Sequence, residues 1–235
     1  MKSLIKKSFS MLNSNIKEIL IFSILLNIAS FASSFFIPYA GYILSVAFSL
    51  YAFQIFINFS KTENFDINNL EEPYYEGILK AYGLNLLLAI PIGALIFASI
   101  SAFFAGMIQI GLKSITFLDF TGGLLAILIL FGIIIGVIFL GVLIINLIFP
   151  FTHLVLLDQD FSGNRFWGNV KLSLKLAKGY RMKIFLTMLL NYLFTMISVV
   201  TLGLSLFYSY PLYMIMISNL YNDSKNNTLI NTTSV

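Results

Sequence analysis

Three side chains that could perform acid–base or metal chemistry lie close together after a proline at position 150. His153 is the only histidine, and Asp158 and Asp160 follow it. One imidazole and two carboxylates could bind a hard metal ion or transfer protons, but so few ligands on an irregular segment are weak evidence for either. The segment 158–163 is more typical of a turn that caps the next helix. We predict no metal site and no cofactor here.

Other catalytic signatures are missing from the chain. It contains no cysteine, which excludes disulfides, thiolate metal sites and cysteine nucleophiles. No nucleophile elbow, phosphate-binding Gly-Lys-Ser/Thr loop or zinc-protease helix motif is present. These absences predict a protein that is not an enzyme and has no catalytic residue. A membrane enzyme built on His153, Asp158 and Asp160 remains an alternative.

A second candidate site is a basic helix face. Lys171, Lys175 and Lys178 follow the spacing i, i+4, i+7, which places them on one side of a helix, and Ser173 lies near the centre of the apolar arc. Such helices lie in the membrane interface with lysines toward anionic headgroups. We predict a lipid-headgroup site at these three lysines. A helix that only anchors the topology is the alternative.

A third set consists of amides within apolar stretches: Asn27, Gln54, Asn85, Asn146 and Asn191. Amides in such places bond between helices or line a polar path. No charged residue and no histidine lies in the core of any apolar stretch. This counts against an ion-coupled pump or carrier, which usually needs such groups.

Membrane helices must position all of these residues. Apolar residues make up 59% of the chain and charged residues 10%, with a mean hydropathy of +0.92, whereas soluble domains are about a quarter charged. We predict an all-α integral membrane bundle of six spans with two basic interfacial amphipathic helices. The spans are expected at 19–37, 40–59, 84–106, 124–149, 184–204 and 207–221.

The basic residues predict the orientation. With six spans, thirteen of the fourteen Lys and Arg fall on the side of the two termini, and Lys113 alone falls on the other. Positive charges gather in the cytoplasm, so we predict both termini there, in a bacterial plasma or inner membrane. The net charge of +4 therefore reflects topology and does not indicate nucleic acid. Tyr208, Tyr210 and Tyr221 are expected in the two interfacial aromatic belts.

A parallel internal repeat is also predicted, within a single transmembrane domain at 1–222. A shift of 165 residues superposes Lys6 on Lys171, Ser8 on Ser173 and Ile19 on Ile184, which gives repeat-like units at about 3–60 and 166–223. The polar residues 223–235 are expected to form a disordered cytoplasmic tail. The acidic loop 61–77 is expected to be solvated and partly paired with the lysines. Small residues should form a helix-packing face, namely Ala94, Ala98 and Ala102 against Gly132 and Gly136.

The last third of the chain resembles a bacterial membrane family. Its pattern is a proline closing a span, an Asp-rich turn, a basic helix with Ser and Lys-Gly, and then a Pro and a terminal Tyr in the last span. The matching residues are Pro150, Asp158, Asp160, Ser173, Lys178, Gly179, Pro211 and Tyr221. The family includes the inner-membrane protein YciC and is similar to the membrane domain of some glycerophosphodiester phosphodiesterases. The resemblance implies about six spans and no established activity.

These observations lead to one functional expectation. We expect a non-enzymatic polytopic membrane protein that acts through lipid or protein contacts in the envelope, with anionic lipids as partners and a protein partner or a second copy of the chain as a further candidate. The alternative is a channel or transporter component with an amide-lined polar path.

Overall fold

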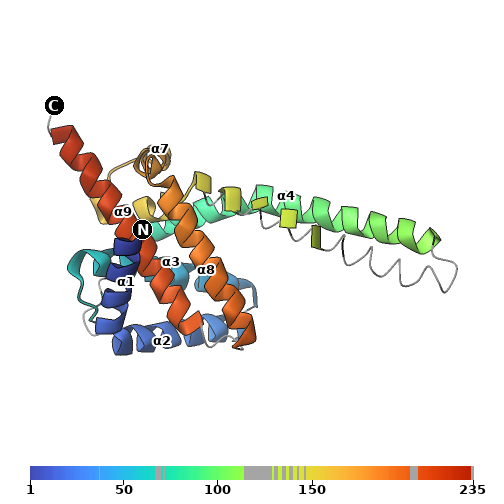
Figure 1. The fold of residues 1–235 in the computed structure, drawn as a ribbon, viewed down its shortest axis with the longest axis horizontal. Coiled ribbons are helices and arrows are strands. Elements are labelled where there is room, and N and C mark those ends of the chain that lie inside the picture. The colour runs from blue at the N-terminus through green and yellow to red at the C-terminus, as the bar shows by residue number, and fades with distance from the viewer. Residues whose placement is uncertain are drawn as a thin grey trace. The chain divides into compact units, whose positions relative to one another are not determined.

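The computed structural model describes residues 1–36, 38–66, 70, 72–113, 147–201 and 206–233, and ten positions between 129 and 145. All its regular structure within these residues is helical, which confirms the all-α prediction for them. The elements, shown in Figure 1, are α1 (Lys2–Ser14), α2 (Ile16–Phe36), α3 (Pro38–Thr62), α4 (Tyr75–Lys113), α6 (Thr152–Leu157), the 3₁₀-helix η2 (Gln159–Phe161), α7 (Phe166–Ala177), α8 (Arg181–Val200) and α9 (Leu206–Thr233).

Two helical segments in the described part of the chain are long and apolar enough to cross a membrane, at Ile43–Thr62 and Tyr75–Gly106. A third is possible if α1 and the first half of α2, which meet at an angle of 83°, count as one broken span. These helices indicate a membrane protein. The predicted fourth span, 124–149, lies mostly outside the described residues.

The chain forms two compact units rather than the single domain predicted. Unit 1 comprises Met1–Gly83 and Phe149–Val235, and unit 2 comprises Leu84–Ile148. Unit 1 therefore joins the two ends of the sequence, and it contains the His153 segment, the basic helix face and most of the charged residues.

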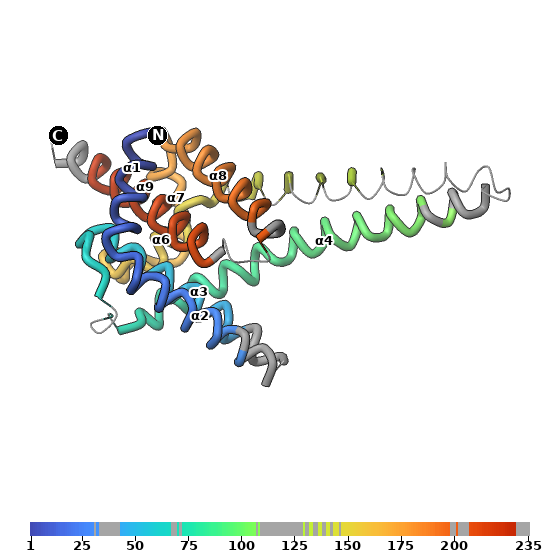
Figure 2. Tube along the Cα trace, turned by 60° about the horizontal axis from the view of Figure 1, so that its bottom comes forward, coloured from blue at the N-terminus to red at the C-terminus, as the bar shows by residue number. Residues whose placement is uncertain are grey.

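Unit 1 is built around α9. This helix contacts α1, α2, α3, α7 and α8, and Figures 1 and 2 both show it lying between α1 and α8. The described residues from Pro211 to Tyr221 are buried, apart from the half-buried Tyr213. This stretch is mostly apolar on every side, which is typical of a helix in the centre of a bundle.

The chain turns sharply between α1 and α2 at Asn15. The Asn15 amide donates to the Met11 carbonyl oxygen (3.1 Å) and accepts a hydrogen bond from the Phe65 backbone N–H (3.2 Å). Ser14 adds a bond to the same Met11 carbonyl oxygen (3.0 Å). These bonds satisfy backbone groups at the end of α1 and attach the chain that follows α3 to the bend.

The burial of α7 follows the predicted amphipathic pattern. Its buried residues are Asn169, Val170, Ser173, Leu176 and Ala177. Ser173 is 0% exposed, as its place at the centre of the apolar arc predicts. A polar group there needs partners, and its hydroxyl bonds to Thr152 Oγ1 (2.7 Å) and to the Val170 carbonyl oxygen (2.8 Å).

Burial also matches between positions 165 residues apart. Ser8 and Ser173 are both 0% exposed, and so are Ile19 and Ile184. Further buried pairs that follow the same shift include Met11 with Leu176, Leu12 with Ala177, Gln54 with Asn219, and Phe56 with Tyr221.

The predicted disordered tail at 223–235 is wrong over most of its length, because α9 continues to Thr233. Ser224 and Lys225 are buried, and the Ser224 hydroxyl donates to the Leu176 carbonyl oxygen (2.6 Å). Composition alone favoured disorder, whereas tertiary hydrogen bonds hold this segment. Residues 234 and 235 lie outside the described part.

Among the described residues the small-residue face predicted in unit 2 is also wrong, since Ala94, Ala98 and Ala102 are exposed and no described atom lies within 4 Å of a Cβ built on Gly132 or Gly136. A Cβ built on Gly141 would instead lie 2.5 Å from Cδ2 of Leu95. The face of α4 in contact therefore runs through Leu95 and the buried Ser99, one residue away from the alanines, or about 100° around the helix. Small residues permit close approach, but spacing does not say which face is used.

Candidate functional site

The α7 lysine face points away from the rest of unit 1 and consists of Lys171, Lys175 and Lys178. All three lysines are exposed, and within the described residues none forms an ion pair. Trp167, which is 66% exposed, lies within about a quarter of the helix circumference from them. Tryptophan prefers the membrane–water interface. Sequence reasoning missed this residue, although its spacing of four from Lys171 could have placed it on the face.

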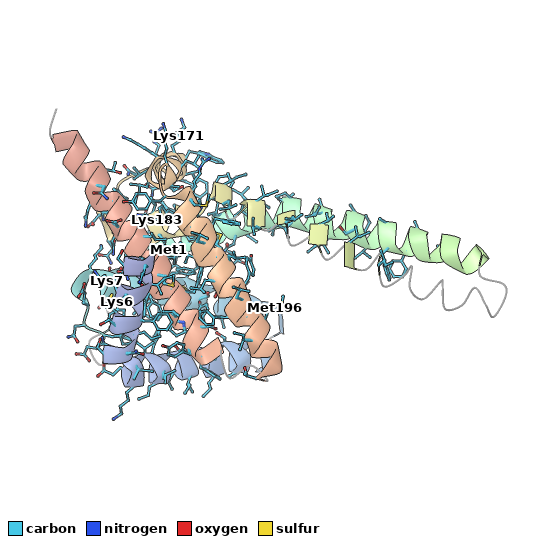
Figure 3. All side chains as sticks on the ribbon, viewed as in Figure 1. Met1, Lys6, Lys7, Lys171, Lys183 and Met196 are labelled. Atoms are coloured by element: carbon cyan, nitrogen blue, oxygen red, sulfur yellow. The ribbon has the colours of Figure 1, made fainter. Side chains whose placement is uncertain are left out.

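The turn after α7 sets the direction of the next helix. Gly179 adopts a φ of 92°, a left-handed conformation that favours glycine, and α8 begins two residues later at Arg181. Lys183 of α8 lies over the ring of Tyr180, with its Nζ 4.7 Å from the ring centroid. Figure 3 shows Lys171 well apart from Lys6 and Lys7 of α1.

Of the predicted amides, Asn27, Gln54 and Asn191 belong to unit 1. The Asn27 amide donates to the Ser23 carbonyl oxygen of its own helix (2.7 Å), and the backbone carbonyl oxygen of Asn191 accepts from the Thr195 hydroxyl (2.9 Å). Asn85 belongs to unit 2, and Asn146 lies outside the described residues. The amide path therefore stays a prediction.

Gln54 joins a helix to a loop. Its amide nitrogen donates to the Glu72 carbonyl oxygen (3.0 Å), and its amide oxygen accepts from the Tyr74 backbone N–H (2.8 Å). The acidic loop is shorter than predicted, because α4 begins at Tyr75, where Glu76 and Lys80 form an ion pair of 2.6 Å. The expected pairing of loop and lysine occurs once more between Glu63 and Lys7 (2.6 Å).

His153 lies in α6, where burial lowers its pKa to about 4, so its imidazole is neutral at pH 7. Within the described residues, no group of three or more His, Asp or Glu side chains could hold a metal ion. The two aspartates that follow it have lysine partners.

These aspartates form the Asp158 cluster, which consists of Lys61, Asp158, Asp160, Tyr221 and Lys225. Asp158 is 3% exposed. Its Oδ2 accepts from Lys225 Nζ (2.7 Å) and from the Tyr221 hydroxyl (2.8 Å), and its Oδ1 lies 3.4 Å from Lys61 Nζ. Asp160 also pairs with Lys225 and lies 3.7 Å from Lys61 Nζ. The Asp158 cluster therefore ties the end of α3, the η2 turn and the end of α9 together.

The Asp158 cluster favours the charged forms of the Asp160 carboxyl and the Lys225 ammonium. The hydrogen bond from Lys225 holds the pKa of the Asp160 carboxyl below its ordinary value. Burial alone would lower the pKa of Lys225, but its hydrogen bonds to Asp158 and Asp160 outweigh that effect and raise this pKa above its ordinary value. A buried lysine is tolerable here because two carboxylates compensate its charge.

The sequence identified the two aspartates but not their partners. Tyr221 was assigned to an aromatic belt, yet it is 0% exposed and bonds to Asp158. Lys225 was assigned to a disordered tail. The segment 158–163 was expected to form a turn that caps the basic helix, whereas the Asp158 side chain accepts from the Asp160 backbone N–H and caps η2. The available signal was the shift of 165, which aligns Tyr221 with Phe56 and Lys225 with Ser60 of α3. All four residues are buried.

A polar hollow of about 690 Å³ opens beside the Asp158 cluster, between α1, the end of α3, η2, the start of α8 and α9. Its lysines are Lys7, Lys61, Lys183 and Lys225. Its carboxylates are Glu63, Asp160 and Asp223. Charged residues from distant parts of the sequence thus meet in one hollow within unit 1.

Comparisons with known protein families, curated proteins and solved structures found no match to this chain. The resemblance to the YciC family therefore stays a prediction, and the functional argument rests on the geometry of unit 1.

Proposed function

We propose that this chain is a non-enzymatic polytopic membrane protein that acts through lipid contacts, and that the α7 lysine face binds anionic headgroups. The observation that carries the proposal is the division of α7 into two faces. Val170, Ser173, Leu176 and Ala177 are buried in unit 1, while the lysines and Trp167 are exposed on the other side. A helix in the interface has this arrangement.

The membrane topology is part of the proposal. Six spans would consist of α2, α3, α8, α9, the apolar part of α4 and the segment 124–149. Both termini would lie in the cytoplasm of a bacterial cell, since the basic residues concentrate on one side. The matched burial of positions 165 residues apart supports the parallel repeat, in which α1 corresponds to α7 in sequence.

The energetics favour headgroup contact over a purely structural role for these lysines. Each basic residue near an anionic membrane surface adds about 1 kcal/mol. Because Lys171, Lys175 and Lys178 have no acidic partner among the described residues, their charges are available to lipid phosphates. Trp167 would sit at the headgroup level beside them.

The test is to replace Lys171, Lys175 and Lys178 together with Gln and to measure retained anionic lipid by native mass spectrometry. Loss of about 1 kcal/mol for each lysine predicts more than a tenfold fall in lipid affinity. High salt should reproduce the loss, because exposed charges are screened within about 8–10 Å.

A matched control removes the same charge elsewhere, by replacing the exposed Lys2, Lys6 and Lys17 with Gln. This variant should keep more anionic lipid than the α7 variant. Equal lipid retention in the wild type and the α7 variant would end the proposal. An equal loss in the two variants would also contradict it, because net charge rather than a particular face would then attract the lipid.

A further inference from the structure

The charges that line the polar hollow differ in how well they are paired. Lys61 and Lys225 are held by the Asp158 cluster. Lys7 pairs with Glu63, but their side chains are 49% and 56% exposed, and an exposed pair contributes only about 0–1 kcal/mol. Lys7 can therefore exchange its partner at little cost, whereas the two lysines of the cluster cannot.

Two further charges on the hollow have no oppositely charged partner within the described residues. Lys183 contacts only the ring of Tyr180. Asp223 accepts hydrogen bonds from the Tyr180 hydroxyl (3.0 Å) and the Asn227 amide (3.5 Å), both of which are neutral. Tyr180 thus lies beside an unpaired cation and an unpaired carboxylate, both on the wall of the hollow.

A buried acceptor on the same wall also lacks a partner. The Asn222 amide nitrogen donates to the Ile57 carbonyl oxygen (3.3 Å) and to Ser60 Oγ (2.5 Å), which fixes the orientation of the amide. Its Oδ1 is buried without a hydrogen bond within the described part of the chain. Buried polar atoms normally have partners, so Asn222 is an incompletely satisfied residue in the wall of the hollow.

We propose that the polar hollow binds a zwitterionic phosphate ester, with its phosphate at Lys183 and Lys7 and its ammonium group at Asp223. Four lysines and three carboxylates line the hollow. The carboxylates would repel a simple anion, and the lysines would repel a simple cation. A molecule that carries both charges can pair with a lysine and a carboxylate at the same time. The volume of about 690 Å³ is in the range of small-molecule sites. This site is separate from the α7 lysine face and does not depend on the function proposed for it.

The primary test is calorimetric titration of the purified full-length protein with phosphoethanolamine, compared with inorganic phosphate and with ethanolamine alone. The ester should bind more tightly than either part. Lys183→Gln and Asp223→Asn should each weaken its binding about tenfold, the usual consequence of losing one charged hydrogen bond. Lys183→Arg should retain binding, and Lys171→Gln, on the α7 lysine face, should leave it unchanged.

Two sources could supply such a group, a phospholipid headgroup or a soluble ester, and native mass spectrometry separates them. Phosphatidylethanolamine adducts that decrease in Lys183→Gln and Asp223→Asn would identify the lipid. Unchanged adducts with impaired ester titration would identify a soluble ester. If neither readout depends on these two residues, or if phosphate alone binds as tightly as the ester, the proposal is overturned. Unfolding temperatures of the variants with and without ester provide a second measure of binding, and Lys183→Arg keeps the test valid if Lys183→Gln does not fold.

Discussion

The segments α1–α3 and α7–α9 bury residues at corresponding positions, 165 residues apart, but they fill those positions with different chemistry. Ile19 and Ile184 are both 0% exposed, and so are Ser8 and Ser173. The difference lies near the ends of α3 and α9. There the buried Phe56 corresponds to Tyr221, and Ser60 corresponds to Lys225.

The end of α3 is held by aromatic rings. The Phe56 ring centroid lies 6.3 Å from that of Phe22, 6.4 Å from that of Phe59 and 5.9 Å from that of Phe65. Ser60, at the position that corresponds to Lys225, donates to the Ile57 carbonyl oxygen of its own helix (2.8 Å) and accepts from the Asn222 amide (2.5 Å). Apart from Lys61, which belongs to the Asp158 cluster, the contacts of this end are aromatic packing and neutral hydrogen bonds.

The end of α9 is held by charges and hydrogen bonds. The Tyr221 ring lies 5.7 Å from the ring of Phe151, and its hydroxyl bonds to Asp158. Lys225 adds an ion pair to the same carboxylate. Apolar contacts tolerate exchange of similar shapes, whereas a buried ion pair is costly when one partner is lost. The comparison predicts that the two ends respond differently to equivalent substitutions.

The largest effect is expected for Asp158→Ala, which removes the buried carboxylate from the Lys225 ammonium and leaves only the more exposed Asp160 beside it. We expect the free energy of unfolding in detergent to fall by about 3–5 kcal/mol. The corresponding change at the α3 end, Ser60→Ala, should cost only about 1 kcal/mol. The double variant Asp158→Ala, Lys225→Met should recover part of the loss, because it also removes the buried Lys225 ammonium that has lost the Asp158 carboxylate. Equal stability of the single and double variants would show that the ion pair does not hold α9.

An intermediate effect is expected when a hydroxyl is exchanged between the two ends. Tyr221→Phe removes the bond to Asp158 and should cost about 1–3 kcal/mol, the range for a bond to a charged group. Phe56→Tyr places a hydroxyl among apolar rings and should also cost about 1–3 kcal/mol, unless it finds a partner. Chemical unfolding followed by circular dichroism measures both. If Tyr221→Phe is neutral while Phe56→Tyr is destabilising, the hydroxyl of Tyr221 contributes nothing and the contrast between the ends is reduced.

The smallest expected effect is a pH dependence of stability that is confined to the end of α9. The pKa of Asp160 is lower in the folded protein than its ordinary 3.8, so its contribution is present above that value and is lost as pH falls through the folded pKa. The pKa of Lys225 is raised above 10.5, so its contribution is present below that value and is lost as pH rises through the folded pKa.

Hydrogen exchange of residues 222–233, corrected for intrinsic rates, measures this pH dependence. Protection should be constant between about pH 5 and about pH 9 and should decrease on both sides. In Lys225→Met the alkaline decrease should disappear. Residues 50–57 of α3, which precede Lys61 of the Asp158 cluster, serve as the internal reference, and an identical pH profile for that segment would contradict a specific role for the Asp158 cluster.

Much of the architecture was predictable from the sequence because it depends on local properties. Apolar length predicted helices close to α2, α3, α8 and α9, and the spacing of lysines around Ser173 predicted both faces of α7. The shift of 165 superposes Ser8 and Ile19 on Ser173 and Ile184, and all four residues are buried. Periodicity records which side of a helix avoids water, so a single sequence contains this information.

Only the tertiary structure decided which residues meet. Lys225 pairs with Asp158 across 67 positions of the chain, and Lys7 and Lys183 share one hollow from α1 and α8. The polar composition after Asp223 favoured disorder, yet ion pairs and hydrogen bonds to distant residues keep that segment helical. In the same way, Ala94, Ala98 and Ala102 share one side of α4, but that side does not form the predicted helix contact. Spacing along a helix determines which residues share a side, whereas the partner of that side depends on how separate helices approach in space, which no local pattern encodes.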